Sequence, residues 1–219
     1  MDTRTTITAM PTDGLLPLLW LASPALPVGG FSYSEGLEAA VDAGLVTDET
    51  QAAEWLVQQL HLTLARADLV VVKRVIADAS QADAMNDWAL RTRETSELRQ
   101  QTVQMGKSMM ALTPALSQRE REPVCYPVAW ALTAAGFGLD VPRALYAFAF
   151  GWAENMVQAA VRVVPLGQNA GQRILARLAG EIPSAVDHAM ACDEPQAFSP
   201  MLAILSSRHE NQYSRLFRS

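Results

Sequence analysis

Two residues of the chain have a spacing at which their side chains could bind a metal ion together. His188 and Cys192 are four positions apart, so they share one face if the segment is an α-helix. Imidazole and thiolate are ligands that zinc takes in proteins, but a structural zinc site usually needs four ligands. His61 is isolated along the chain, and the sequence does not name the missing ligands. A pair of ordinary histidine and cysteine side chains is the simpler interpretation, and a small helical metal carrier or enzyme using His188 and Cys192 is the alternative.

A second candidate for chemistry is the glycine pair in SPALPVGGFSYSEGLE, residues 23–38. A phosphate-binding P-loop needs a Lys followed by Ser or Thr after its second glycine, and Gly30 is followed by Phe31 instead. A hydrolase nucleophile turn needs Gly-x-Ser-x-Gly, and Ser34 stands where the last glycine would be. The sequence therefore predicts neither a nucleotide loop nor a serine hydrolase.

The same segment is better explained as structure. Ser32 and Glu35 have the spacing of a capping box, which predicts a helix start. Phe31 and Tyr33 are not needed for that cap. Aromatic side chains in a short loop are typical of a surface that a partner covers.

Helical periodicity dominates the elements that must position these residues. Leu98, Thr102, Met105, Met109 and Leu112 follow one another at spacings of four and three, which places them on one face of a long helix. Asp48 and Gln51 have capping-box spacing before another apolar helix. Further helices are predicted over Leu15–Leu21, Ser34–Ala43, Asp68–Ala79, Asp83–Thr92, Cys125–Phe137, Val141–Val164, Asn169–Leu178 and Ser199–Ser207. The prediction is an all-α, single-domain helical bundle of about eight to ten helices.

Composition narrows the class of protein. The formal charge of −6 disfavours non-specific nucleic-acid binding, and with it a helical DNA-binding regulator. Two cysteines are too few for a disulfide framework and fit a reducing compartment. The first residues lack the pattern of a signal peptide, and charged residues interrupt the longest apolar stretch, 139–166. We expect a cytoplasmic protein without a membrane span.

The end of the chain, RHENQYSRLFRS, is unusual because it combines aromatic and arginine side chains. Such side chains are common interface anchors. Burial of the few large apolar side chains roughly offsets the entropy of ordering seven residues, so we expect residues 213–219 to become well ordered only with a partner. A C-terminal segment docked on the protein's own core is the alternative. Arg162, which precedes the PLGQ turn, is predicted to be a cation at a helix C-terminus.

Four segments together resemble the family of the urease accessory protein UreF. They are SPALPVGGFSYSEGLE, RETSELRQQTVQMGKS, VRVVPLGQNAGQRIL and RHENQYSRLFRS, and they occur in order over nearly the whole chain. The resemblance implies an all-α protein that binds UreD (also called UreH) and recruits the GTPase UreG to apo-urease. It also implies modulation of GTP-dependent nickel insertion, homodimerisation within the complex, and no catalytic, metal or cofactor site in this chain.

The composition and the motifs also lead us to expect a division of the chain and a set of partner-binding residues. The chain would divide into a flexible N-terminus (1–13), the all-α domain (14–207) and a partner-binding tail (208–219). The candidate partner-binding residues are Phe31, Tyr33, Glu35, Arg162, Gln168, His209, Tyr213, Arg215, Leu216, Phe217, Arg218 and Ser219.

Overall fold

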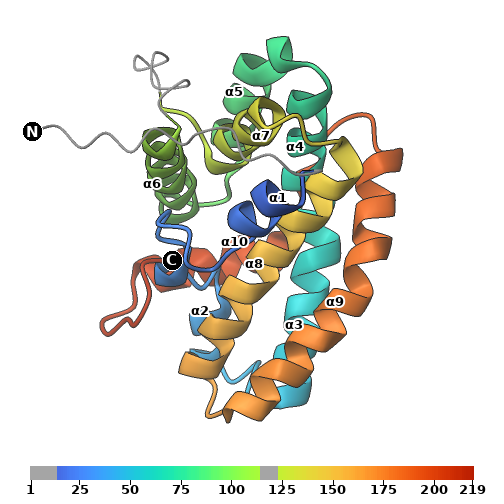
Figure 1. The fold of residues 1–219 in the computed structure, drawn as a ribbon. Coiled ribbons are helices and arrows are strands. Elements are labelled where there is room, and N and C mark those ends of the chain that lie inside the picture. Colours follow the sequence, from blue (N-terminus) through green and yellow to red (C-terminus); the bar gives the residue numbers. More distant parts are fainter. Residues whose placement is uncertain (1–13, 114–122) are drawn as a thin grey trace, which may run out of the picture.

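The structure is a computed structural model that describes residues 14–113 and 123–219. The described residues form an all-α fold, as predicted (Figure 1). Its α-helices are α1 (Leu15–Leu21), α2 (Leu37–Asp42), α3 (Glu49–Gln59), α4 (Asp68–Ala77), α5 (Ala82–Thr92), α6 (Ser96–Leu112), α7 (Tyr126–Gly136), α8 (Val141–Val163), α9 (Gln168–Ala191) and α10 (Pro200–Glu210). Short helical turns occur at η1 (Gly30–Ser32), η2 (Leu60–Leu64, a π-helix continuing α3) and η3 (Ala79–Gln81).

The two longest helices, α8 and α9, lie side by side and form one wall of the molecule (Figure 1). The α8 helix begins where the Asp140 carboxylate accepts a hydrogen bond from the Arg143 amide, and Pro142 occupies its first turn. It ends just before Pro165, because the residue preceding a proline disfavours helical geometry. Helix α7 packs against both α4 and α6 on the other side of the core.

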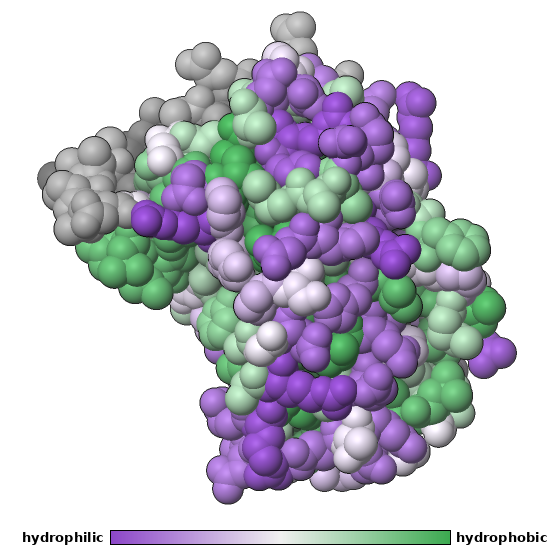
Figure 2. All heavy atoms as spheres, turned by 90° about the vertical axis from the view of Figure 1, so that its right-hand side faces the viewer, coloured by the Kyte–Doolittle hydropathy of each residue, from purple (hydrophilic) through white to green (hydrophobic). Residues whose placement is uncertain are grey.

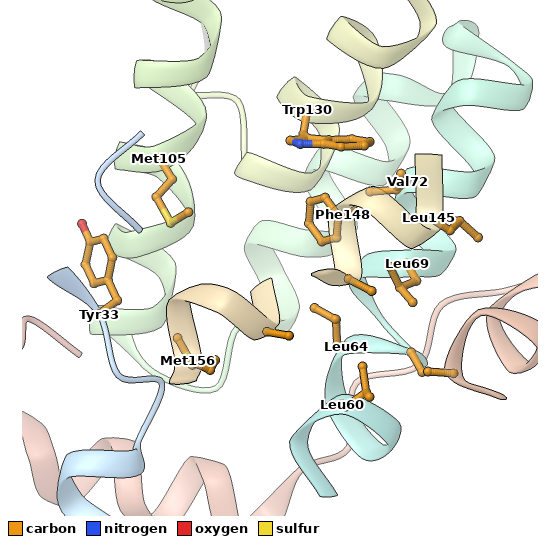
Figure 3. Packing of buried hydrophobic residues seen from close by; sticks show 14 of the residues in the cluster. Tyr33, Leu60, Leu64, Leu69, Val72, Met105, Trp130, Leu145, Phe148 and Met156 are labelled. Carbon is orange, nitrogen blue, oxygen red and sulfur yellow. The ribbon is translucent and has the colours of Figure 1, made fainter. Parts of the chain in front are cut away.

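Apolar side chains fill the core between helix α8 and helices α4 and α7. The rings of Trp130 and Phe148 pack edge to face with their centroids 5.2 Å apart. Figure 3 shows Phe148 below Trp130, with Leu145, Leu69 and Val72 nearby. The long amphipathic face predicted for α6 is confirmed, since Leu98, Thr102, Met105 and Met109 are buried and Leu112 is partly buried. Figure 2, which views the molecule from the side of α9, shows an outer face covered mainly by hydrophilic residues.

Most predicted helices are present with ends that differ by at most three residues from the prediction. The cap at Asp48 is confirmed, because its carboxylate accepts a hydrogen bond from the Gln51 amide. The predicted stop of α9 near Leu178 is wrong. The helix continues through Pro183 to Ala191, because its next turns bury an apolar face that includes Ile182 and Val186 and offsets the missing backbone hydrogen bond. The charged segment SQREREP (117–123), which the sequence suggests as a connector between helices, lies mostly outside the described residues.

The predicted capping box at Ser32 and Glu35 is also wrong. Helix α2 begins only at Leu37, after Gly36 with a φ of 78°. Glu35 itself has a φ of 50°, so its backbone turns away from the helix instead of capping it.

Among the described residues, no helix is both long and apolar enough to cross a membrane.

Candidate partner-binding site

Residues 208–210 of the predicted tail belong to α10, and the remaining residues, 211–219, are folded against the domain as the C-terminal tail. The Glu38 carboxylate of α2 accepts hydrogen bonds from the amides of Leu216 and Phe217, at 2.7 and 2.9 Å. The Phe217 side chain is only 5 % exposed and belongs to the hydrophobic core. The expectation that the tail is poorly ordered without a partner is therefore wrong. That expectation compared only the burial of apolar side chains with the entropy of ordering the tail. It left out the charge-assisted hydrogen bonds that the Glu38 carboxylate accepts from the tail backbone.

Ser219 is held by α6 and by the first loop, the segment 22–36 between α1 and α2. The Ser219 carbonyl oxygen accepts hydrogen bonds from the amide and the hydroxyl of Ser34, at 2.7 and 2.6 Å. Its hydroxyl donates to the Gln101 side chain at 2.7 Å. The amide of Arg218 donates to the Ser32 carbonyl oxygen at 2.9 Å. The two segments singled out at opposite ends of the sequence therefore lie side by side.

Behind the tail, His209 of α10 is fully buried between two carboxylates. Its Nε2 lies 3.1 Å from Glu38 Oε2 and its Nδ1 lies 2.7 Å from Glu97 Oε2. Both ring nitrogens can donate only when the ring is protonated. Glu97 also forms an ion pair with Arg215 of the tail. Buried charges are retained when they are paired and hydrogen-bonded, and this network links α2, α6, α10 and the tail.

Glu35 anchors the first loop from the inside. Its two carboxylate oxygens accept hydrogen bonds from Gln101 Nε2 at 2.8 Å and from Trp152 Nε1 at 2.9 Å. Burial raises the pKa of Glu35, and the hydrogen bond from Trp152 opposes that shift. A non-glycine residue with a positive φ is held only where its surroundings fix it. Glu35 therefore shapes the loop and is not an exposed contact.

Arg162, near the C-terminal end of α8, joins the loop to the tail. It donates a hydrogen bond to the Phe31 carbonyl oxygen at 3.2 Å, and its guanidinium carbon lies 6.0 Å from the centroid of the Phe217 ring. Cation–π contacts of this length are weakly attractive. Arg162 is exposed to solvent.

The structure divides the sequence-predicted residues into two groups. Exposed on the surface are Phe31, Arg162, Gln168, Tyr213, Arg215, Leu216 and Arg218; buried or partly buried are Tyr33, Glu35, His209, Phe217 and Ser219. The interpretation of Tyr33 as a surface aromatic does not hold, because it is 4 % exposed and its hydroxyl donates to Gln104. Tyr213 and Leu216 instead project from the tail, with 105 % and 73 % of their surface exposed.

We call the exposed side chains of Phe31, Arg162, Tyr213, Arg215, Leu216 and Arg218 the tail surface. It combines apolar groups with three arginines on a backbone that is already fixed. Sequence reasoning missed the residues that fix it, Ser34, Glu38, Glu97 and Gln101. The signal available was weak: Glu38 is a charged residue among Leu37, Ala39 and Ala40, as expected of a carboxylate facing the interior.

A second exposed surface lies across α1, α8 and α9. An open groove of about 380 Å³ is lined chiefly by apolar side chains, including Leu18, Leu19, Tyr146, Phe150 and Ile182. Leu19, Tyr146 and Phe150 are also exposed at 59 %, 40 % and 37 %. We call this the α1–α8 groove. Contiguous exposed apolar surface is typical of interaction sites for proteins, membranes or ligands.

The part of the chain that the structure describes contains no group of three or more His, Cys, Asp or Glu residues placed to hold a metal ion. His61 pairs with Glu181 at 3.0 Å. The His188–Cys192 pair predicted to share a helix face does so, with Sγ and Nε2 3.4 Å apart. The described residues thus define an all-α protein whose C-terminal segment presents exposed aromatic, aliphatic and arginine side chains.

Comparison with known proteins is consistent with that class. The UreF family profile matches residues 46–179. The chain is 59 % identical to the urease accessory protein UreF of Paracidovorax citrulli (strain AAC00-1), over 96 % of this chain and 91 % of that protein. It is 55 % identical to the UreF of Polaromonas sp. (strain JS666) and 53 % identical to that of Methylibium petroleiphilum (strain PM1), in both cases over 96 % of this chain and 97 % of the relative. The chain belongs to the UreF family of urease accessory proteins.

Proposed function

We propose that the chain binds a UreD-type (UreH-type) accessory protein and recruits the GTPase UreG to apo-urease. In this assembly it modulates the GTP-dependent insertion of nickel into the urease active site, in the cytoplasm. Family membership over nearly the full length supports this role. The nickel is cargo of the assembly, and the chain acts as an adaptor without catalysis of its own.

The observation that carries the proposal is the tail surface. Leu216 is held in solvent by a backbone whose amides, from Leu216 to Arg218, are bonded to Glu38 of α2 and to Ser32, and Tyr213 is fully exposed just before this segment. Rigid exposed anchors bind a partner at a low entropic cost. The neighbouring arginines can form charge-assisted hydrogen bonds with carboxylates of that partner.

The α1–α8 groove supports a second component of the proposal, a homodimer within the complex. The groove is apolar and contiguous with the exposed side chains of α1. A two-fold interface uses the same surface of both subunits, and the exposed apolar side chains along the groove offer such a surface. A Tyr146→Asp/Phe150→Asp variant should leave one copy of this chain in place of two in the purified complex with a UreD-type partner, as measured by light scattering, if this face forms the dimer. An unchanged dimer would place the interface elsewhere.

The adaptor role is tested with exposed residues of the tail surface. We expect Tyr213→Ala/Leu216→Ala to reduce co-purification of UreD- and UreG-type partners and urease activation, with an unchanged melting temperature. Leu62→Ala is the matched control, because Leu62 is an exposed apolar residue in η2. Equal recovery of partners with both variants would exclude the tail surface as the binding site.

Arg162→Ala provides an independent test. The protein should remain soluble because the side chain is exposed, while urease activation falls. Insoluble protein would mean that the contacts of Arg162 with Phe31 and Phe217 serve the fold. Deletion of residues 213–219 should also abolish activation, but it removes the buried Phe217 and is therefore the less selective test.

A further inference from the structure

A buried histidine lies where the tail meets the domain. His209 is fully buried, with its Nδ1 2.7 Å from Glu97 Oε2 and its Nε2 3.1 Å from Glu38 Oε2. A neutral imidazole carries one N–H group and can donate to only one of these carboxylates, whereas the protonated ring donates to both. The contacts on the two sides of the ring therefore fit its protonated form.

Both carboxylates that contact this ring are also bonded to the tail. Glu38 accepts hydrogen bonds from the Leu216 amide through Oε1 and from the Phe217 amide through Oε2. Glu97 pairs with Arg215 through the oxygen that does not contact the ring. When the ring is neutral, one carboxylate faces a ring nitrogen without a proton, and the lone pairs of the two atoms repel each other. Because that carboxylate is fixed by the tail, it can turn away from the ring only by breaking its bonds to the tail.

The other charges near the ring leave this dependence in place. His209 lies in the last turn of α10, where the helix dipole favours a cation. Arg215 opposes protonation by like-charge repulsion, but its ion pair is with Glu97, whereas both carboxylates contact the ring directly. Glu210 of α10 faces the start of α6, and the hydrogen bond from Ser96 lowers the pKa of its carboxyl. Glu210 is therefore ionised at neutral pH and does not change charge there.

We propose that His209 is a proton-dependent switch for docking of the tail. The protonated ring keeps Glu38 and Glu97 in the positions that bind the tail, and loss of the proton loosens the tail. The docked state binds the proton more tightly than the undocked state, so docking is strongest at lower pH and weakens as the pH rises. Histidine is the side chain that ordinarily changes charge in the physiological range. The switch therefore decides whether the tail surface stands on a fixed or a mobile backbone.

The test is amide hydrogen exchange of the purified full chain, followed by mass spectrometry, between about pH 5.5 and 8.5. At each pH, the exchange rate of peptides that cover residues 211–219 is divided by the intrinsic rate of an unstructured chain, which gives the protection of the tail. We expect this protection to fall by up to about tenfold per pH unit while the proton is released, with little change for peptides of α8. The Hε1 resonance of His209 should titrate with the same midpoint.

Two variants distinguish the switch from a purely structural role. His209→Gln cannot be protonated, so the protection of its tail should not depend on pH in this range. In Glu97→Gln, the amide group can donate to Nδ1 of the neutral ring while the side-chain oxygen still accepts from Arg215, so the tail should stay protected at high pH. His61→Gln is the control, because His61 pairs with Glu181 of α9, and it should keep the pH dependence of the unmodified chain.

The outcome for the unmodified chain does not depend on any variant folding. Tail protection that is constant over the whole pH range would overturn the proposal. A pH dependence that persists in Glu97→Gln or in His209→Gln would also overturn it, because another group would then be responsible. The measurements use the isolated chain, so their failure would leave the proposed partner binding unaffected.

Discussion

Replacing Glu38 by Gln should release the tail while leaving the helices intact. The Glu38 carboxylate accepts hydrogen bonds from two tail amides, at 2.7 and 2.9 Å, and its Oε2 also faces His209. Glutamine retains the shape but supplies one acceptor oxygen in place of two and carries no charge. At least one tail amide loses its acceptor, and the other loses a charge-assisted bond.

The size of the effect follows from these bonds. A hydrogen bond to a charged group contributes about 1.5–3 kcal/mol, and an unsatisfied buried donor costs about 1–3 kcal/mol. We therefore expect tail docking to weaken by about 2–4 kcal/mol, which corresponds to a roughly 30-fold or greater rise in the undocked fraction.

Two measurements report the undocked fraction. Amide hydrogen exchange at Leu216 and Phe217 should accelerate in proportion, and trypsin should cut faster after Arg215, while the circular dichroism at 25 °C stays helical. Glu54→Gln is the matched control, since it removes an exposed ion pair with Arg177 that is worth about 0–1 kcal/mol. Wild-type exchange rates at the two tail amides in Glu38→Gln would refute the reasoning, as would loss of the helices together with the tail.

Two further predictions concern close packing and thiol chemistry. Gly106→Ala should lower the free energy of unfolding by about 3 kcal/mol, because its Cβ would lie 1.9 Å from the Val124 carbonyl oxygen; Gly180→Ala, with open space around it, should instead raise it by roughly 0.5–1 kcal/mol. Urea denaturation of the pair checks this, and equal effects would contradict it. Burial raises the pKa of Cys125 to about 12, so its thiolate is absent near neutral pH and forms only as the pH approaches that value. Metal-free native protein should be alkylated at Cys192 alone, and both thiols should react in denaturant; native labelling of Cys125 at a comparable rate would show that its burial is wrong.

Local patterns determined the helices of this protein. The cap at Asp48 and the buried face of α6 depend on residues three or four positions apart, and such spacings are visible in the sequence. The four motifs likewise identified the family, because they occur in a fixed order along the chain. The spacing of His188 and Cys192 also predicted correctly that the two side chains meet.

The tertiary structure decided how the candidate site is built. Glu38 contacts His209 and Phe217 across 171 and 179 positions, and no local spacing encodes contacts of that range. The same contacts order the tail, which an account limited to its own seven residues could not include. Phe31 and Tyr33 are two positions apart, yet one is exposed and the other buried. The reason is physical: the burial of a loop side chain depends on what other segments bring to it, here the packing of α6 and the returning tail.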